Sequence, residues 1–373
     1  MKKIVFLTGT RADFGKQKSL IKIINKKKAF DVTIFITGMH NLKKFGYTWE
    51  EIKKENYKNI FRYNNQKHNN SMDIILSNTV YGFSNFVKKV KPDLIVYHGD
   101  RVEALAGAIV GSLNNILTAH IEGGELSGTI DESIRHSVSK LSHYHFVSNK
   151  NSEKRLIQMG ENKNNIFNIG SPDIDLMYSN NLPSLELMRR RYQISFNKYA
   201  LCIYHPVTTE KKYNKLHADI FFKSLELSEK NYIIIYPNND TGSDYIFKKI
   251  KSLKSKKIKK FPSMRFEFFL SCLKNSEFII GNSSAGIREA SYYGVPAINV
   301  GSRQQMRERT PNVFDCKHNS NEILRCINKM KNIKKKVEKI YGNGKSDTKF
   351  LKILNKKNFW EKQLQKKFFE IEF

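Results

Sequence analysis

Short apolar runs alternate with longer segments of helical pattern along most of this chain. This alternation is typical of a parallel β-sheet whose strands are joined by crossover helices. In the first half, predicted strands at 3–8, 31–37, 94–97, 117–121, 145–148 and 166–169 are separated by helical patterns such as 16–27, 72–90, 101–113 and 133–141. The pattern predicts a doubly wound α/β domain.

The alternation is interrupted after Gly170-Ser171-Pro172 and then restarts, with predicted strands at 199–204, 232–236, 278–280 and 297–300. We therefore expect a first domain at 1–172, a second at 173–350, and a C-terminal helix at 351–373 that packs on the first domain. The predicted fold class is α/β, with two Rossmann-like, doubly wound domains and a cleft between them. Such sheets bind ligands at the carboxyl ends of their strands.

The charge is strongly positive, since 65 Lys+Arg against 35 Asp+Glu give a net charge of +30 over 373 residues. The excess is mostly Lys spread along the chain, a pattern that fits solvated helix faces and loops better than a nucleic-acid site. A basic surface also concentrates an anionic substrate. We expect no nucleic-acid partner.

No run approaches about 18 apolar residues, so we expect no membrane-spanning helix. The first apolar run is too short for a signal peptide, which predicts a cytoplasmic protein. The four cysteines are scattered without a CxxC pair, so neither a zinc site nor a disulfide framework is expected. Free, buried thiols are the prediction.

The first strand leads into the turn Thr8-Gly9-Thr10-Arg11-Ala12-Asp13-Phe14-Gly15-Lys16. Backbone N–H groups at the start of a helix attract anions, and Arg11 and Lys16 add full charges. The turn is a candidate phosphate site, although it matches neither GxGxxG nor a Walker A loop. The same residues fit an ordinary structural turn.

A second candidate anion site follows a strand of the second half: Asn282, Ser283, Ser284 and Gly286, with Glu289 expected one turn inside the next helix. Its small residues let a diphosphate approach the backbone, and the carboxylate suits ribose hydroxyls. An ordinary helix cap is the alternative. Asn238 follows another strand and is either a binding residue or part of a turn.

Three acidic residues give a more specific functional signal than the two candidate anion sites. Asp100 and Glu122 each follow a predicted strand, and Asp131 opens a helix that also carries Arg135. In a parallel sheet these acids converge on one edge, where their carboxyl pKa values are pushed apart to give an acid and a base. Asp131 also fits a simple helix-dipole partner. His205, which ends a strand of the second half, is expected to face the same cleft.

Eight motifs together resemble a known family: TGTRADFGK, TGMH, HGDRVEALAGA, HIEGGELSGTIDESIRHSVSKLSH, IGSPD, HPVTTE, YPNNDTG and GNSSAGIREA. They resemble the hydrolysing UDP-N-acetylglucosamine 2-epimerases of bacterial sialic acid synthesis, from residue 3 to about residue 303. The resemblance implies the GT-B fold and the conversion of UDP-N-acetylglucosamine and water to N-acetylmannosamine and UDP. It implies no metal or redox cofactor. We expect a homodimer or homotetramer.

The wider family has acids that match Asp100, Glu122 and Asp131 and a histidine that matches His205. Its nucleotide-contacting positions match Arg11, Lys16, Arg135, Ser284, Gly286 and Glu289. Ala285 departs from the Gly-Gly common in the non-hydrolysing branch, and the segment 37–40 lacks the glutamines that help that branch hold a regulatory UDP-sugar. Both departures favour the hydrolysing branch.

Our hypothesis places Asp100 and Glu122 nearest C1 and C2 of the sugar. Asp131 serves as acid or base in the second step, and His205 assists at the diphosphate or at a sugar hydroxyl. Three alternatives stay open: a hydrolysing 2-epimerase of a UDP- or GDP-linked diacetamido-trideoxy sugar, a GT-B glycosyltransferase, and, last, a nucleic-acid-binding protein.

Overall fold

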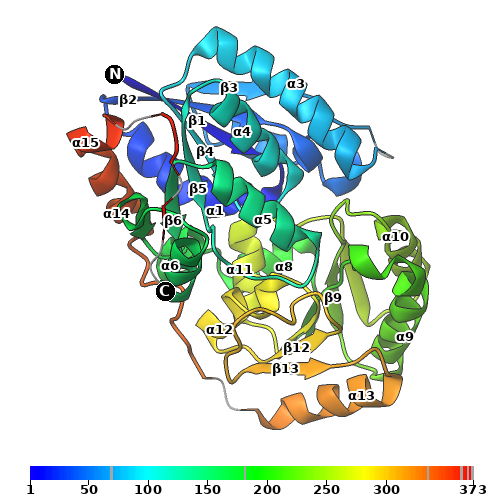
Figure 1. Ribbon diagram of the computed structural model, residues 1–373. Coiled ribbons are helices and arrows are strands. Elements are labelled where there is room, and N and C mark those ends of the chain that lie inside the picture. The colour runs from blue at the N-terminus through cyan, green and yellow to red at the C-terminus, as the bar shows by residue number, and fades with distance from the viewer. Residues whose placement is uncertain (68–69, 180–181, 334–335, 362–363, 368, 371–373) are drawn as a thin grey trace. The chain divides into compact units, whose positions relative to one another are not determined.

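The computed structural model describes residues 1–67, 70–179, 182–333, 336–361, 364–367 and 369–370. The chain forms two compact units (Figure 1). Unit 1 comprises 1–125, 131–180 and 340–373, and unit 2 comprises 126–130 and 181–339.

Unit 1 is built on a seven-stranded parallel sheet in the order β3-β2-β1-β4-β5-β6-β7. Its strands are β1 (Lys2–Thr8), β2 (Phe30–Ile36), β3 (Asn59–Arg62), β4 (Leu94–His98), β5 (Leu117–Ile121), β6 (Tyr144–Val147) and β7 (Ile166–Asn168). Its helices are α1 (Arg11–Asn25), α2 (Trp49–Lys53), α3 (Met72–Val90), α4 (Val102–Leu113), α5 (Ile130–Leu141), α6 (Lys150–Gln158), α7 (Pro172–Tyr178), α14 (Ser346–Leu354) and α15 (Lys357–Trp360).

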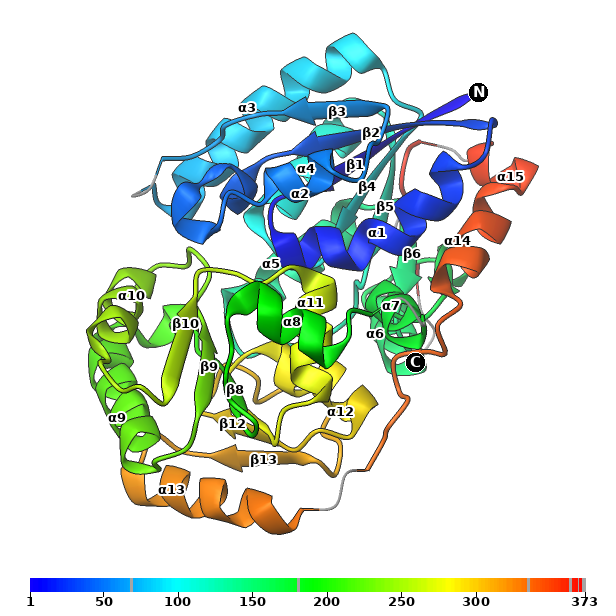
Figure 2. The same ribbon diagram turned by 180° about the vertical axis from the view of Figure 1, so that it is seen from behind.

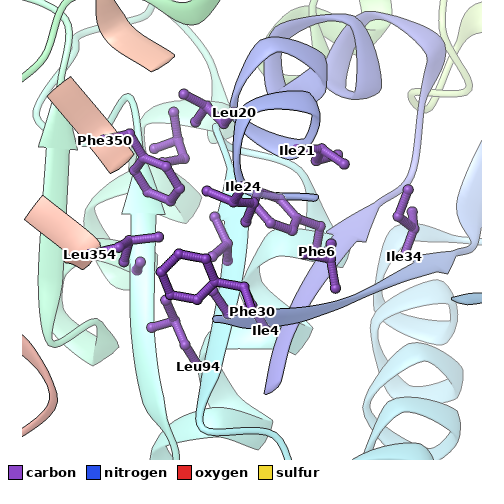
Figure 3. Packing of buried hydrophobic residues seen from close by; sticks show 14 of the residues in the cluster. Ile4, Phe6, Leu20, Ile21, Ile24, Phe30, Ile34, Leu94, Phe350 and Leu354 are labelled. Atoms are coloured by element: carbon purple, nitrogen blue, oxygen red, sulfur yellow. The ribbon is translucent and has the colours of Figure 1, made fainter. Parts of the chain in front are cut away.

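Helices cover both faces of the sheet in unit 1. Side chains of successive strand residues point to opposite sides, so each strand contributes apolar side chains to both cores. Ile4 and Phe6 of β1 join a core with residues of α1 and α14, whereas Val5 and Leu7 join a core with residues of α3, α4 and α5. Figure 3 shows the first of these cores, with Leu20 and Ile24 of α1 beside the strands. Both layers are typical of a doubly wound sheet.

The C-terminal segment belongs to unit 1, where α14 and α15 lie on the α1 side of the sheet (Figure 2). Phe350 and Leu354 of α14 are buried in the same core as Phe6 (Figure 3). The Phe350 ring meets those of Phe6 and Phe146 edge-on, with centroids 6.5 and 4.8 Å apart. A segment from the far end of the sequence therefore completes the first core.

Unit 2 is built on a six-stranded parallel sheet in the order β10-β9-β8-β11-β12-β13. Its strands are β8 (Ala200–Ile203), β9 (Tyr232–Ile235), β10 (Ile258–Phe261), β11 (Ile279–Gly281), β12 (Ala297–Val300) and β13 (Val313–Cys316). Its helices are α8 (Leu185–Tyr192), α9 (Asn214–Leu227), α10 (Ser243–Ser252), α11 (Phe266–Lys274), α12 (Glu289–Tyr293) and α13 (Ser320–Lys329). One face of this sheet packs against apolar residues of α9, α10 and α13.

The predicted fold class, α/β with two doubly wound sheets, is confirmed. All ten predicted strands are present, within one or two residues of their expected bounds. The prediction missed β3, β10 and β13, and each is an edge strand. Edge strands carry polar and charged side chains that discourage pairing with other chains, and this weakens the apolar pattern that marks a strand.

In the described part of the chain, no helix has both the length and the apolar character needed to cross a bilayer. The four cysteines are free, as predicted: Cys202, Cys272 and Cys316 are buried, and Cys326 is half-buried.

Candidate functional site

The acid cluster of unit 1 is built on two neighbouring strands. β4 and β5 pair in parallel register with His98 opposite Ile121, so Asp100 and Glu122 follow the carboxyl ends of adjacent strands. The turn after β4 is tied to β5, since Gly99 N donates to Ile121 O at 3.0 Å. The two acids thus share one edge of the sheet.

Glu122 has an unusual backbone. Its φ is +63°, in the left-handed region that costs a non-glycine residue about 1–2 kcal/mol. Hydrogen bonds hold it there: its N–H donates to Phe146 O at 2.8 Å, and its carbonyl accepts from Arg135 Nη1 at 2.6 Å. Strain of this kind is typical of functional positions. This backbone conformation points the Glu122 side chain into a buried network.

The Glu122 carboxylate is surrounded by donors. Oε2 lies 2.9 Å from His98 Nε2 and 3.5 Å from Lys16 Nζ, and Oε1 accepts a hydrogen bond from Ser171 Oγ. Lys16 Nζ also lies 3.3 Å from Asp173 Oδ2. This network joins α1, β4, β5 and the start of α7.

His98 lies between two carboxylates, with Nδ1 3.5 Å from Asp13 Oδ1 and Nε2 2.9 Å from Glu122 Oε2. Burial lowers the pKa of His98, but the charges and hydrogen bonds of Glu122 and Asp13 outweigh burial and raise it to about 9. His98 is therefore an imidazolium at neutral pH.

His120, the other histidine that flanks the acids, has the opposite character. Burial lowers its pKa well below the ordinary value, so the ring is neutral. Nε2 donates to Gly99 O at 2.7 Å, which leaves Nδ1 to accept from Ser139 Oγ at 3.0 Å. This histidine supports the turn that precedes Asp100.

Arg135 connects the two strand-end acids. The buried guanidinium donates to the Glu122 carbonyl and, through Nη2, to Asp100 Oδ2. The Asp100 side chain is 22% exposed, in contrast to 2% for Glu122. Asp100 is therefore the more accessible of the two carboxylates.

Asp131 is the second residue of α5, one turn before Arg135, and is half-buried.

The turn between β1 and α1 departs from its prediction. Two of the amides expected to be open to an anion are already bonded, since Gly9 N donates to Asp13 Oδ2 at 2.9 Å and Asp13 N donates to Thr10 Oγ1 at 3.1 Å. Arg11 pairs with Glu51 of α2. The expectation of free amides is wrong for these two groups because Thr10 and Asp13 cap the helix within the chain.

In unit 2, Asn282 joins the ends of β8 and β11. Its Oδ1 accepts from His205 N at 2.7 Å, and its Nδ2 donates to His205 O at 2.8 Å. The His205 ring accepts at Nδ1 from Asn238 N at 3.2 Å, so a neutral ring carries its proton on Nε2. His205, Asn238 and Asn282, all predicted site residues, are thus brought together.

The small-residue segment after β11 is tightly packed. Gly281 has a φ of +138°, and a Cβ there would lie 1.9 Å from Ile203 O of β8, so only glycine fits. Ser283 Oγ accepts from Ala285 N, and Ser284–Gly286 form a 3-10 turn. The helix expected here begins later, at Glu289, which is its first residue and not one turn inside it. The additional 3-10 turn accounts for the difference.

Several polar residues of these two clusters were not predicted. In unit 1 they are Asp13, Ser171 and Asp173. In unit 2, Arg303 and Gln304 follow β12 and donate to Asn282 O at 3.3 and 3.1 Å. In the sequence, residues 169–173 stood out as one motif of the resemblance and, at 170–172, as the point where the alternation is interrupted, but not as a site. The position of Arg303 after a strand could have identified it. Within the described residues, no group of three or more His, Cys, Asp or Glu side chains is arranged to hold a metal ion.

Comparison with known proteins places this chain in a family. Residues 22–355 match the family model described as UDP-N-acetylglucosamine 2-epimerase. The chain is 44% identical to the UDP-N-acetylglucosamine 2-epimerase of Neisseria meningitidis serogroup B, with all of both chains covered. The chain belongs to the UDP-N-acetylglucosamine 2-epimerase family.

Two further relatives extend the comparison. The UDP-N,N'-diacetylbacillosamine 2-epimerase (hydrolyzing) of Legionella pneumophila is 35% identical over 95% of this chain and 96% of its own. Among solved structures, the Methanocaldococcus jannaschii UDP-GlcNAc 2-epimerase in complex with UDP-GlcNAc and UDP has a TM-score of 0.77 at 25% identity. That match covers 95% of this chain and 99% of the other. The prediction of the wider UDP-N-acetylglucosamine 2-epimerase family and of its GT-B fold is confirmed.

Proposed function

We propose that this protein is a hydrolysing 2-epimerase that converts UDP-N-acetylglucosamine and water to N-acetylmannosamine and UDP, a product that feeds sialic acid synthesis. The observation that carries the proposal is the pair of acids, Asp100 and Glu122, at adjacent strand ends with Arg135 bonded to both residues. General acid–base groups of this kind typically contribute about 10²- to 10⁴-fold each to a rate. Membership of the epimerase family supports the substrate class.

The reaction needs two half-steps. In the first, the bond from C1 to the diphosphate oxygen breaks as a carboxylate takes the proton from C2, and the products are UDP and a glycal. In the second, water adds to C1 while C2 receives a proton on the opposite face. This inverts C2 and gives the manno sugar.

The residues are proposed to divide these tasks. Asp100 and Glu122 lie nearest C1 and C2, Asp131 acts on the water of the second half-step, and His205 donates its Nε2–H to the diphosphate or a sugar hydroxyl. Cationic side chains stabilise the departing diphosphate. The cations are Arg11, Lys16 and Arg135 of the first unit, and Arg303 of the second. Ser283, Ser284 and Gly286 offer hydroxyl and backbone donors, Asn238 and Asn282 hold His205, and Glu289 is proposed for the ribose hydroxyls.

Proton NMR of the purified protein with UDP-N-acetylglucosamine in D₂O tests the proposal. The expected result is free N-acetylmannosamine with deuterium at C2, together with an equal amount of UDP. Formation of UDP-N-acetylmannosamine instead would place the protein in the non-hydrolysing branch.

A second candidate substrate is a UDP-linked diacetamido sugar, because the Legionella relative, at 35% identity, acts by its name on UDP-N,N'-diacetylbacillosamine. The same NMR experiment with both nucleotide sugars, compared by kcat/KM, distinguishes the two. A higher kcat/KM for the diacetamido nucleotide sugar would make it the preferred substrate in place of UDP-N-acetylglucosamine. The proposed hydrolysing reaction would stay the same.

A further inference from the structure

Asp13 and His98 are two titratable residues of unit 1 to which the proposed mechanism gives no task. Asp13 lies in the first turn of α1 and His98 is the last residue of β4, with side chains that are only 11% and 12% exposed. The order of strands along the sheet reverses between β1 and β4, and α1 follows β1. Both residues therefore lie at the edge of the sheet where folds of this class bind ligands.

The Asp13 carboxylate is held in place by the turn between β1 and α1. Its Oδ2 accepts from Gly9 N at 2.9 Å, and its Oδ1 accepts from Gln17 Nε2. Gln17 is fixed in turn, since its Nε2 also donates to Leu7 O at 3.1 Å. The backbone N–H of Asp13 donates to Thr10 Oγ1 at 3.1 Å, and the start of a helix favours a negative charge. Asp13 therefore presents a fixed carboxylate to its neighbours.

The imidazole of His98 lies between two carboxylates, with Nδ1 3.5 Å from Asp13 Oδ1 and Nε2 2.9 Å from Glu122 Oε2. Two other titratable groups are close by: Lys16 of α1 contacts the same Glu122 oxygen at 3.5 Å, and His120 of β5 is neutral. A neutral imidazole has one N–H and would present a lone pair to one carboxylate, whereas the cation presents an N–H to each. The geometry therefore favours the imidazolium.

We propose that Asp13 is a positioning residue of the reaction, which holds His98 as a cation so that the charged Nε2–H fixes the Glu122 carboxylate. A charge-assisted hydrogen bond is roughly twice as strong as a neutral one, so loss of the charge loosens Glu122. Asp13 and His98 do not touch the sugar in this role and act only through Glu122. This inference rests on the proposed function, and it deepens it by naming the residues that hold one of its two central acids in place.

NMR of the protein labelled with carbon-13 at histidine Cε1 tests the hold on His98 without any substrate. The chain has 10 His, and the signal that is missing in His98→Gln belongs to His98. We expect this signal to titrate with a pKa of about 9 in wild type. In Asp13→Asn the pKa should be lower by about 2, because a neutral amide replaces a nearby negative charge.

Thr10→Ala is the matched control for the NMR experiment, since it removes the acceptor of the Asp13 N–H and leaves the carboxylate. It should weaken the start of α1 but keep the wild-type pKa of His98. An unchanged pKa in Asp13→Asn would overturn the proposal. A pKa near 6.5 in wild type would overturn it without any variant of Asp13.

The dependence of kcat on pH tests the action on Glu122. In wild type, kcat should fall as pH rises through about 9, where His98 loses its charge. With a pKa lower by about 2, about a tenth of Asp13→Asn is protonated at pH 8, so its kcat there should be about 10-fold below that of wild type. Lowering the pH to 6 should restore most of kcat, whereas a merely structural defect would persist at both pH values.

Asp73→Asn, at an exposed carboxylate, is the control for the kinetics and should keep the wild-type profile. If Asp13→Asn lowers the pKa of His98 but leaves the fall of kcat near pH 9, the action on Glu122 is overturned. If the wild type turns over no nucleotide sugar, the proposed function fails, while the NMR titration still decides whether Asp13 holds His98 as a cation.

Discussion

Asp100 and Glu122 differ in surroundings although both follow strands of one sheet. Glu122 is buried with a donor on each oxygen, whereas Asp100 is partly exposed and pairs with Arg135. A carboxylate that takes a proton from a substrate must be reachable by that substrate. Asp100 meets this condition in the unit as it stands.

We expect Asp100→Asn to lower kcat by about 10²- to 10⁴-fold, because an amide cannot accept a proton but preserves the size of the side chain. Steady-state release of UDP measures this effect. Asp73→Asn is the matched control at an exposed site and should retain wild-type kcat. Near-normal turnover in Asp100→Asn would remove Asp100 from the mechanism.

The raised pKa of His98 makes stability depend on pH. The pKa is about 9 in the folded chain and near 6.5 when the chain is unfolded. The charged imidazole therefore contributes fully below pH 6.5, and its contribution is lost as pH rises through 9. A shift of this size corresponds to about 3 kcal/mol.

Urea denaturation of wild type and His98→Gln at several pH values measures this contribution. We expect wild type to be more stable than the variant by about 2–3 kcal/mol at pH 6, and the gap to shrink by pH 10. Titration of Lys and Tyr side chains affects both proteins equally, so it cancels in the difference between their free energies of unfolding. A gap that stays constant across this range would show that His98 is not held as a cation.

At the scale of elements, the alternating pattern identified every central strand, because a strand covered on both faces is apolar throughout. The edge strands β3, β10 and β13 contain Arg62, Lys259, Lys260 and Asp315, and they lack such a run. Position after a strand also predicted that Asp100 and Glu122 converge. Ser171 reaches Glu122 from the start of α7, 49 positions along the chain, and no local pattern marks a contact that depends on tertiary folding.

Helix α14 is an element whose contribution can be measured. Phe350 is fully buried between Phe6 and Phe146, so Phe350→Ala should destabilise unit 1 by about 3–5 kcal/mol through the cavity it leaves. The free energy of unfolding in urea tests this. Lys349→Ala, on the exposed side of the same helix, should change it by less than about 0.5 kcal/mol.

At the scale of the whole molecule, the net charge of +30 acts at long range on a diphosphate substrate. Charge attraction speeds encounter, and salt screens it over a Debye length of about 10 Å at 0.1 M. We expect kcat/KM for UDP-N-acetylglucosamine to fall several-fold between about 50 mM and about 500 mM KCl.

The same titration should leave kcat nearly constant, since chemistry after binding does not depend on encounter. NaCl at equal ionic strength should give the same curve, which separates screening from binding of a particular ion. A kcat/KM that is independent of salt would mean that the basic surface does not guide the substrate.

The discontinuous make-up of unit 1 has a consequence for how the chain is made. All residues of unit 2 precede residue 340, whereas the core of unit 1 includes Phe350 and Leu354. During synthesis at about 5–20 residues per second, unit 2 can finish folding while the first sheet still lacks part of its cover. Unit 2 is thus complete before unit 1. Until α14 packs, one apolar face of the sheet of unit 1 is exposed to other nascent chains.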